Sequence, residues 1–220
     1  MKAGLFCIAL ISCFAVLSQK DTSGMVRYSP EYKFKEGIFV NFEQVKLNKP
    51  VSVARIVSDY NPDELDFFEN LTKEEKIFFL DDNGMKQEES TKTIWGYSRN
   101  GNLYINWNGE FNRIPVVGSI SHFIADKTVY YERTPDPYYG YYNGSVFPTT
   151  YSSNEMRQYI LDFETGKVLE FSHDNLETIL IRDNVLYEEY SQLKKRKRRQ
   201  LAFLYMRRFN DNQPLYLPEK

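Results

Sequence analysis

The sequence predicts an α+β fold: an antiparallel β-meander that forms a curled sheet or partial barrel, with short N-terminal helices and a C-terminal helical segment. Four Asn-Gly dipeptides occur at residues 83–84, 100–101, 108–109 and 143–144, and the first three lie between apolar or alternating runs. Such dipeptides are typical of two-residue hairpin turns. From residue 172 onward, apolar residues recur at three-and-four spacing, which indicates helices. Because the predicted strands come first in the sequence and the helices come last, we expect the helices to cover one face or one end of the sheet.

The first eighteen residues predict a signal peptide. Lys2 precedes an apolar run over residues 3–18, and polar residues follow from Gln19. The run is too short for a membrane-spanning helix, and Val16 and Ser18 fit the positions before a cut at Gln19. An alternative is a lipoprotein anchored at Cys13, although an apolar segment follows this cysteine. We therefore expect an exported protein, periplasmic or extracellular, with no transmembrane segment after signal cleavage.

Composition narrows the possible functions further. Both cysteines, Cys7 and Cys13, lie inside the predicted signal, so the mature chain would lack disulfides, thiolate nucleophiles and cysteine metal sites. The net charge is −2 and the pI is about 5.8, which argues against a nucleic-acid partner. Aromatic residues form 16% of the chain, so aromatic packing must contribute much of the core.

The mature chain divides into three expected parts. Residues 19–35 form a polar leader, residues 36–171 a β-rich domain, and residues 172–220 a helical segment packed on the same domain. In the β-rich domain, residues 37–40 predict a strand, and a short helix with Asn41 as N-cap follows. Residues 51–57 predict another strand, and a second helix follows with Asn61 as its cap and Pro62 in its first turn.

Residues 75–133 predict the antiparallel meander, and residues 134–154 predict a long loop rich in tyrosine and proline. One more hairpin is expected around Thr165 and Gly166. The helical part then begins with Ser172 or Asp174 as a cap and continues as one longer helix from about residue 184 to residue 209. The tail after residue 209 is expected to be coil.

The stretch from Trp95 to Glu110 contains both tryptophans and is the first candidate binding surface. A two-residue turn at residues 100–101 sets Tyr97 opposite Tyr104. Trp95, Tyr97 and Tyr104 would share one face, an aromatic surface that can stack on sugar rings. The favoured interpretation is that a helix or second layer covers this face, because exposed aromatic patches of that size are uncommon.

Two further surfaces are candidates. The long loop places tyrosines where recognition residues often occur; these are Tyr138, Tyr139, Tyr141 and Tyr142. The basic patch predicts either a solvated helix or a surface for anionic lipid, and Lys197 would fall on the apolar stripe between Leu193 and Leu201. The patch consists of Lys194, Lys195, Arg196, Lys197, Arg198 and Arg199.

Catalytic and metal-binding patterns are sparse. The two histidines, His122 and His173, have no zinc-ligand spacing, and the chain has no nucleophile elbow and no phosphate-binding glycine loop. No catalytic residue, cofactor or metal is therefore predicted, and an enzyme is the less favoured hypothesis. A glycan-acting hydrolase with an unidentified carboxylate pair is the alternative, because acidic residues are plentiful.

Three stretches together resemble a known group of sequences. They are GIFVNFEQVKLNKP, WGYSRNGNLYINWNGEF, and the charged C-terminal region from residue 174 to residue 217. They are similar to an uncharacterised family of exported Bacteroidota proteins to which no activity is assigned. The resemblance implies that the protein is located in the bacterial envelope, and it implies no catalytic residues for this chain. The expected function is non-catalytic binding of another envelope protein or a glycan, with an anionic-lipid-associated module as a further alternative.

Overall fold

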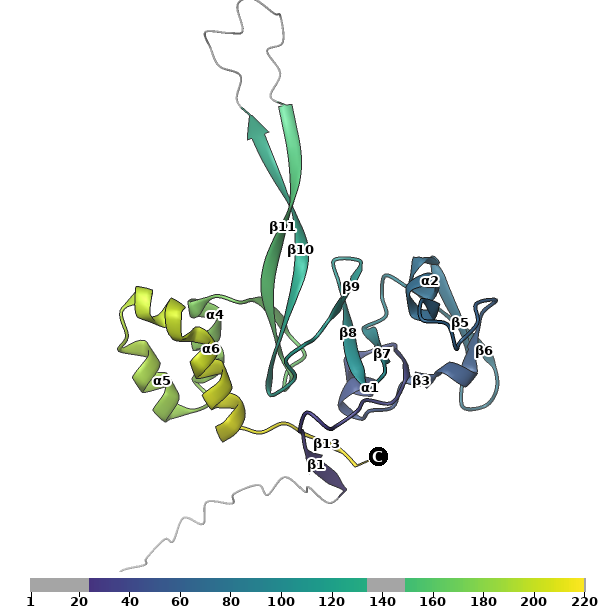
Figure 1. The fold of residues 1–220 in the computed structure, drawn as a ribbon, viewed down its shortest axis with the longest axis horizontal. Helices are drawn as coiled ribbons and strands as arrows, with labels where there is room; N and C mark the ends of the chain where they lie inside the picture. The colour runs from purple at the N-terminus through teal and green to yellow at the C-terminus, as the bar shows by residue number, and fades with distance from the viewer. Residues whose placement is uncertain (1–23, 134–148, 220) are drawn as a thin grey trace, which may run out of the picture.

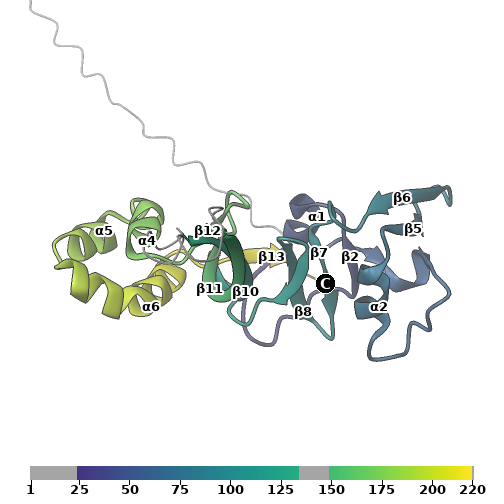
Figure 2. The same cartoon turned by 90° about the horizontal axis from the view of Figure 1, so that it is seen from above.

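The structure is a computed structural model that describes residues 24–133 and 149–219, and it confirms a mixed α+β, β-rich fold. In these residues the strands form four antiparallel sheets, none of which closes into a barrel. Figure 1 shows the helices α4–α6 at one end, a long two-stranded ribbon beside them, and the smaller sheets beyond it; Figure 2 shows the same order from above. The predicted signal peptide, with Cys13, lies outside the described residues, as do Tyr138, Tyr139, Tyr141 and Tyr142.

The central sheet has the order β3–β2–β7–β8–β9. Its strands are β2 (Gly37–Phe39), β3 (Val51–Ser52), β7 (Gly96–Arg99), β8 (Asn102–Trp107) and β9 (Glu110–Arg113). Helix α1 (Phe42–Lys46) connects β2 to β3, and the predicted cap is present because the side chain of Asn41 accepts a hydrogen bond from Gln44 N. The turns at residues 100–101 and 108–109 each have two residues with positive φ, as a type I′ turn requires.

A second, three-stranded sheet contains β4 (Ile56–Val57), β5 (Lys76–Leu80) and β6 (Lys86–Ser90). The short 3₁₀ helix η1 (Val53–Arg55) leads into it, and α2 (Phe67–Lys73) precedes β5. Helix α2 begins five residues later than predicted, with Asp66 rather than Asn61 as its N-cap residue. Asn61 Oδ1 accepts a hydrogen bond from Asp63 N at 3.1 Å, and such a local turn competes with helix formation.

The loop between β5 and β6 also differs from the predicted two-residue turn. Leu80 pairs with Lys86, so five residues connect the strands. The carboxylate of Asp81 accepts hydrogen bonds from the backbone N of Asn83 and of Met85 at 2.8 and 2.9 Å. These hydrogen bonds stabilise a loop wider than a two-residue turn. In this loop Gly84 has a positive φ and Asn83 does not.

The expected single meander over residues 75–133 is divided among three sheets. The long strands β10 (Ile120–Arg133) and β11 (Thr149–Asp162) pair with each other along their whole length, and β12 (Val168–Glu170) pairs with β11 near its end. The hairpin expected around Thr165 and Gly166 is therefore present between β11 and β12. Residues 149–154, predicted as part of the loop, belong to β11.

The C-terminal helices are α4 (His173–Leu180), α5 (Asn184–Ser191) and α6 (Lys195–Asn212). Ser172 caps α4, as one of the two predicted residues. The prediction of a single long helix from residue 184 is wrong, because the helix is interrupted between the end of α5 and the start of α6. The break lets α6 fold back, so that Tyr190 is fully buried and its ring lies 4.8 Å from the ring of Tyr205.

Three clusters of buried side chains hold these elements together. One joins the central sheet to the base of the ribbon and includes Phe39, Leu103, Phe123 and Leu161. The second joins α4–α6 to the opposite side of the ribbon base. The third lies between the central sheet, α2 and β5. The base of the ribbon is thus buried on both sides, and the elements packed against it fix its direction.

The two ends of the described chain pair with each other. β1 (Met25–Arg27) lies within the predicted leader and β13 (Tyr216–Pro218) within the predicted coil tail, and they form an antiparallel pair. Leu217 is fully buried in the cluster beside the central sheet. We call this pair the terminal clasp. In Figure 1 it lies on the side of the molecule opposite to the projecting ribbon.

Candidate functional site

The hairpin formed by β7 and β8 has the predicted register, but one of its aromatic side chains lies on a different face from the one predicted. Tyr97 pairs with Tyr104 and Gly96 with Ile105, as a two-residue turn requires. Trp95 was expected on the same face as Tyr97, and this expectation is wrong. Its backbone O still accepts from Asn106 N at 2.8 Å and its N donates to Phe39 O at 3.0 Å, but its ring packs into the cluster beside the ribbon base and not into the cluster of Tyr97.

Helix α2 covers the remaining aromatic face. Phe68 stacks on Tyr97 with ring centroids 4.7 Å apart and an interplanar angle of 1°, and Tyr104 stacks on the other side at 4.7 Å. Only 9% of Tyr97 is exposed. Burial is the main cause that raises the pKa of Tyr97 to about 12. The favoured interpretation of a covered face is thus correct for Tyr97.

The predicted basic patch lies where α6 begins. Lys194 is the N-cap residue, and Lys195, Arg196, Lys197 and Arg199 are exposed. Lys197 was expected on the apolar stripe, and this is wrong: Arg198 lies there. The break before α6 shifts the stripe so that it runs through positions 198, 202, 205 and 209, and Arg198 forms an ion pair with Glu177 of α4. The patch is therefore mainly a solvated helix end.

The two histidines are both buried, and they lie on different elements, β10 and α4. His122 is 6% exposed, its Nε2 lies 3.2 Å from Gln158 Oε1, and its ring lies edge-on to Phe171 and Phe203. Burial lowers the pKa of His122, and the hydrogen bond to Gln158 opposes this effect. His173 pairs with Asp174 at 3.4 Å. Within the described ranges, no cluster of three metal-ligating side chains occurs.

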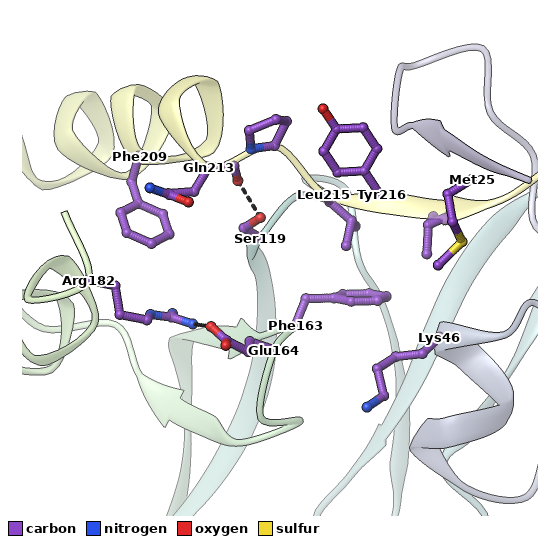
Figure 3. A pocket seen from close by; sticks show the side chains of 12 residues that line it. Met25, Lys46, Ser119, Phe163, Glu164, Arg182, Phe209, Gln213, Leu215 and Tyr216 are labelled. Carbon is purple, nitrogen blue, oxygen red and sulfur yellow. Dashed lines mark hydrogen bonds and ion pairs between the residues drawn. The ribbon is translucent and has the colours of Figure 1, made fainter. Parts of the chain in front are cut away.

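A groove lies between the terminal clasp, α6 and the β11–β12 turn. It has a cavity volume of about 390 Å³, and Figure 3 shows its side chains. Phe163, Phe209 and Leu215 supply apolar lining, and Lys46 approaches from α1. Its size lies within the range of small-ligand pockets.

The charged side chains beside this groove form a local cluster of ion pairs. Arg182 pairs with Asp162 at 2.9 Å and also with Glu164, and its guanidinium lies 5.3 Å from the centroid of the Phe209 ring. The two carboxylates hold one guanidinium between the helices and the β11–β12 turn. This arrangement joins two parts of the fold, and it is not the open pair of acids that glycoside hydrolysis needs.

Among the described residues, the distal part of the long hairpin projects from the fold; we call it the free ribbon and define it as residues 126–132 and 150–156. Asp126 pairs with Met156 at its base and Glu132 with Thr150 at its outer end. Figure 1 shows this ribbon extending away from the rest of the fold. Most of its side chains are exposed, and none is buried.

The two faces of the free ribbon differ in chemistry. On one face Tyr131 and Tyr151 stack with ring centroids 5.2 Å apart, and the hydroxyl of Tyr131 donates to Glu155. The opposite face presents Tyr130 and Met156, which are 72% and 79% exposed. Large side chains of this kind, exposed together on one element, are typical of surfaces that contact a partner.

Sequence reasoning missed this ribbon as a site. Tyr130 and Tyr131 stand in a run that was read as ordinary meander, and Tyr151 was assigned to the loop. The available signal was that residues 120–131, which are rich in β-branched and aromatic side chains and contain no glycine or proline, continue past the length of a typical strand. The four loop tyrosines proposed for binding lie outside the described residues; in the sequence they stand between residues 133 and 149.

In the part of the chain that the structure describes, no helix is long and apolar enough to cross a membrane. No curated protein and no solved structure matches the chain. A protein-family model for a family of unknown function matches residues 37–213, which include the central sheet, the free ribbon and the helices α4–α6. The chain therefore belongs to the DUF6563 family, whose function is unknown.

Proposed function

We propose that this protein is an exported, non-catalytic binding protein of the bacterial envelope that holds a partner protein with its free ribbon. The observation that carries the proposal is the exposure of Tyr130, Tyr131 and Tyr151 on an element whose base is buried on both sides. Tyrosine supplies a large contact area at a low cost in conformational entropy. A buried base holds these rings in place before a partner binds, which reduces the cost of ordering them.

A protein partner fits the ribbon better than a glycan does. The free ribbon offers backbone N–H and C=O groups along its edges, and an extended peptide strand satisfies such groups. The glycan hypothesis rested on Trp95, Tyr97 and Tyr104 as an open aromatic surface. Two of these residues stack in a layer beneath α2, and Trp95 packs elsewhere.

Site-specific photo-crosslinking in the native cell tests this proposal. A photoreactive phenylalanine analogue at Tyr130 should give a discrete adduct with another protein in the envelope fraction. The matched control carries the same analogue at Val185, which is 64% exposed on α5. The combined Tyr130→Ser and Tyr151→Ser substitutions should remove the adduct formed from a third position, Met156. An adduct pattern that is the same at Tyr130 and Val185 would contradict the assignment.

Export is tested separately. N-terminal sequencing of the protein recovered from the envelope should begin at Gln19, or at Cys13 if the lipoprotein alternative holds. Recovery of an intact Met1 from the cytosol would rule out the envelope assignment and the partners proposed from it. The photo-crosslinking result at the ribbon would still stand as evidence on binding, so the two parts of the proposal fail independently.

A further inference from the structure

One edge of β11 is left open for most of its length. β12 pairs only with residues Tyr159–Leu161. On this side the O atom of Gln158 accepts from Phe171 N at 2.7 Å, and the N of Asp162 donates to Lys167 O at 2.9 Å. Backbone groups alternate in direction along an antiparallel strand. The N–H and C=O groups of Thr150, Ser152 and Asn154 therefore point to the same open side.

The sequence of this edge lacks the usual protection against pairing. Natural edge strands carry charges, proline or bulges that prevent edge-to-edge association. Residues 149–154 read TTYSSN, with neither charge nor proline. The facing segment of β10, residues 128–133, contains Glu132 and Arg133. In this part of the ribbon the β11 edge carries no charge whereas the β10 edge does, so the β11 edge is the less protected of the two.

We propose that the β11 edges of two copies of this chain pair antiparallel about a two-fold axis at Ser152. The four strands would form one continuous sheet in the order β10–β11–β11–β10. This inference goes beyond the proposed function: it assigns the β11 edge to a second copy and leaves the faces and the β10 edge of the free ribbon to the partner protein. A second copy is the favoured occupant because a two-fold pair places each residue opposite a residue of the same short segment, and an uncharged segment does so without like-charge repulsion.

The position of the axis follows from which groups are free. With Ser152 opposite Ser152 of the partner subunit, Thr150 lies opposite Asn154 of the partner subunit, and the outward groups form about six hydrogen bonds. Moving the axis to Asn154 sets Thr150 against Gln158 of the partner subunit, whose carbonyl already accepts from Phe171. Moving it to Met156 sets Ser152 against Ile160 of the partner subunit, where β12 already pairs. Of these three positions, Ser152 is the one that leaves the outward groups of Thr150, Ser152 and Asn154 all available.

Dimerisation in this register would also change the faces of the ribbon. A two-fold axis perpendicular to the sheet keeps each face on the same side, so the stacked Tyr131–Tyr151 pairs of both copies would share one face. Tyr151 would lie opposite Ser153 of the partner subunit, a pairing that leaves room for the ring. The contact area doubles without any new side chain.

A pair of proline substitutions tests the inference with the purified chain, expressed without its predicted signal peptide. Ser152→Pro removes an outward N–H of β11 and leaves the ladder with β10, because proline is tolerated on an open edge. Thr128→Pro removes an outward N–H in the same way from the edge of β10. Sedimentation equilibrium over a range of concentrations should show a monomer–dimer equilibrium that Ser152→Pro weakens at least about tenfold and that Thr128→Pro leaves unchanged.

Disulfide trapping gives a second, independent readout. Ser152→Cys should form an oxidised dimer, since hydrogen-bonded antiparallel pairs have Cα atoms about 5.5 Å apart, a distance that a disulfide spans. Thr128→Cys should not form one under the same conditions. A wild type that stays monomeric at every concentration would overturn the inference, and so would a dimer that Ser152→Pro does not weaken or that Thr128→Pro weakens equally. Circular dichroism of each variant confirms that it is folded.

Discussion

Replacing Phe68 with alanine removes the ring through which α2 covers the central sheet. Phe68 is 2% exposed, and its ring lies parallel to that of Tyr97 at 4.7 Å. Truncation of such a buried phenylalanine costs about 3–5 kcal/mol of unfolding free energy. About 0.5–1.5 kcal/mol of this loss belongs to the ring–ring geometry itself. Since single domains are stable by only about 5–15 kcal/mol, the variant should unfold at a much lower urea concentration.

Urea unfolding followed by circular dichroism measures the loss, with Leu65→Ala as the control. Leu65 immediately precedes Asp66, the N-cap residue of α2, and is 85% exposed, so its truncation should change stability by no more than about 0.5 kcal/mol. A double-mutant cycle of Phe68→Leu with Tyr97→Leu isolates the ring–ring part. Equal losses for Phe68→Ala and Leu65→Ala would refute the role given to α2.

The phenol of Tyr97 gives a second readout in the folded variant. Burial raises the pKa of Tyr97 to about 12, and loss of the covering ring should lower it toward the ordinary value of about 10. Spectrophotometric titration of the phenolate, with Tyr97→Phe to identify the signal, measures this change. An unchanged titration in a folded Phe68→Ala protein would mean that the sheet, and not α2, keeps water from the phenol.

Three further predictions concern other parts of the fold. Burial lowers the pKa of His122, so the unfolded chain binds more protons than the folded chain as the pH falls below about 6.5. The free energy of unfolding should therefore decrease with falling pH until the pH reaches the folded-state pKa. His122→Asn should flatten this part of a plot of melting temperature against pH. Leu217 in the terminal clasp is fully buried, so Leu217→Ala should cost about 2–5 kcal/mol in urea unfolding; a much smaller loss would mean that the clasp frays in solution. Arg182→Met leaves Asp162, which is 7% exposed, without its cation and should cost about 3 kcal/mol; adding Asp162→Asn should recover part of the loss, and no recovery would argue against the ion pair as the cause.

Local turn and cap chemistry could be predicted from the sequence. The positive φ values that Asn100 and Gly101 supply dictate a type I′ turn, and this turn fixes the pairing of Tyr97 with Tyr104. Asn41 and Ser172 cap helices because their side chains reach a backbone N–H three residues later. These features depend on a few neighbouring residues, so the sequence contains the information in one place.

Features that depend on distant residues could not be predicted in this way. Three-and-four spacing continues across the α5–α6 break, and the fold-back there depends on tertiary packing, such as the burial of Tyr190 against Tyr205. The partner strand of β10 begins at Thr149, after a segment rich in proline and glycine that reads as loop. The pairing of β1 with β13 joins two short segments from opposite ends of the chain, and neither has a strand pattern of its own.

The candidate site shows the same limit. Aromatic residues mark a binding surface only when nothing covers them, and burial is decided by tertiary packing. Tyr97 and Tyr130 are both tyrosines on strands, yet one is 9% exposed and the other 72% exposed. The difference comes from α2, which lies over Tyr97, and from the length of β10, which carries Tyr130 past the core.

The terminal clasp makes this chain a natural subject for circular permutation. Met25 pairs with Pro218, and the N of Glu219 donates to Gly24 O at 2.8 Å, so a linker of a few residues could join the two ends of the fold directly. New ends could then be opened at Asn108 and Gly109, which form an exposed turn. Such a rearranged chain would keep every strand pair in place and would present its free ends beside the base of the ribbon, where a reporter group could be attached.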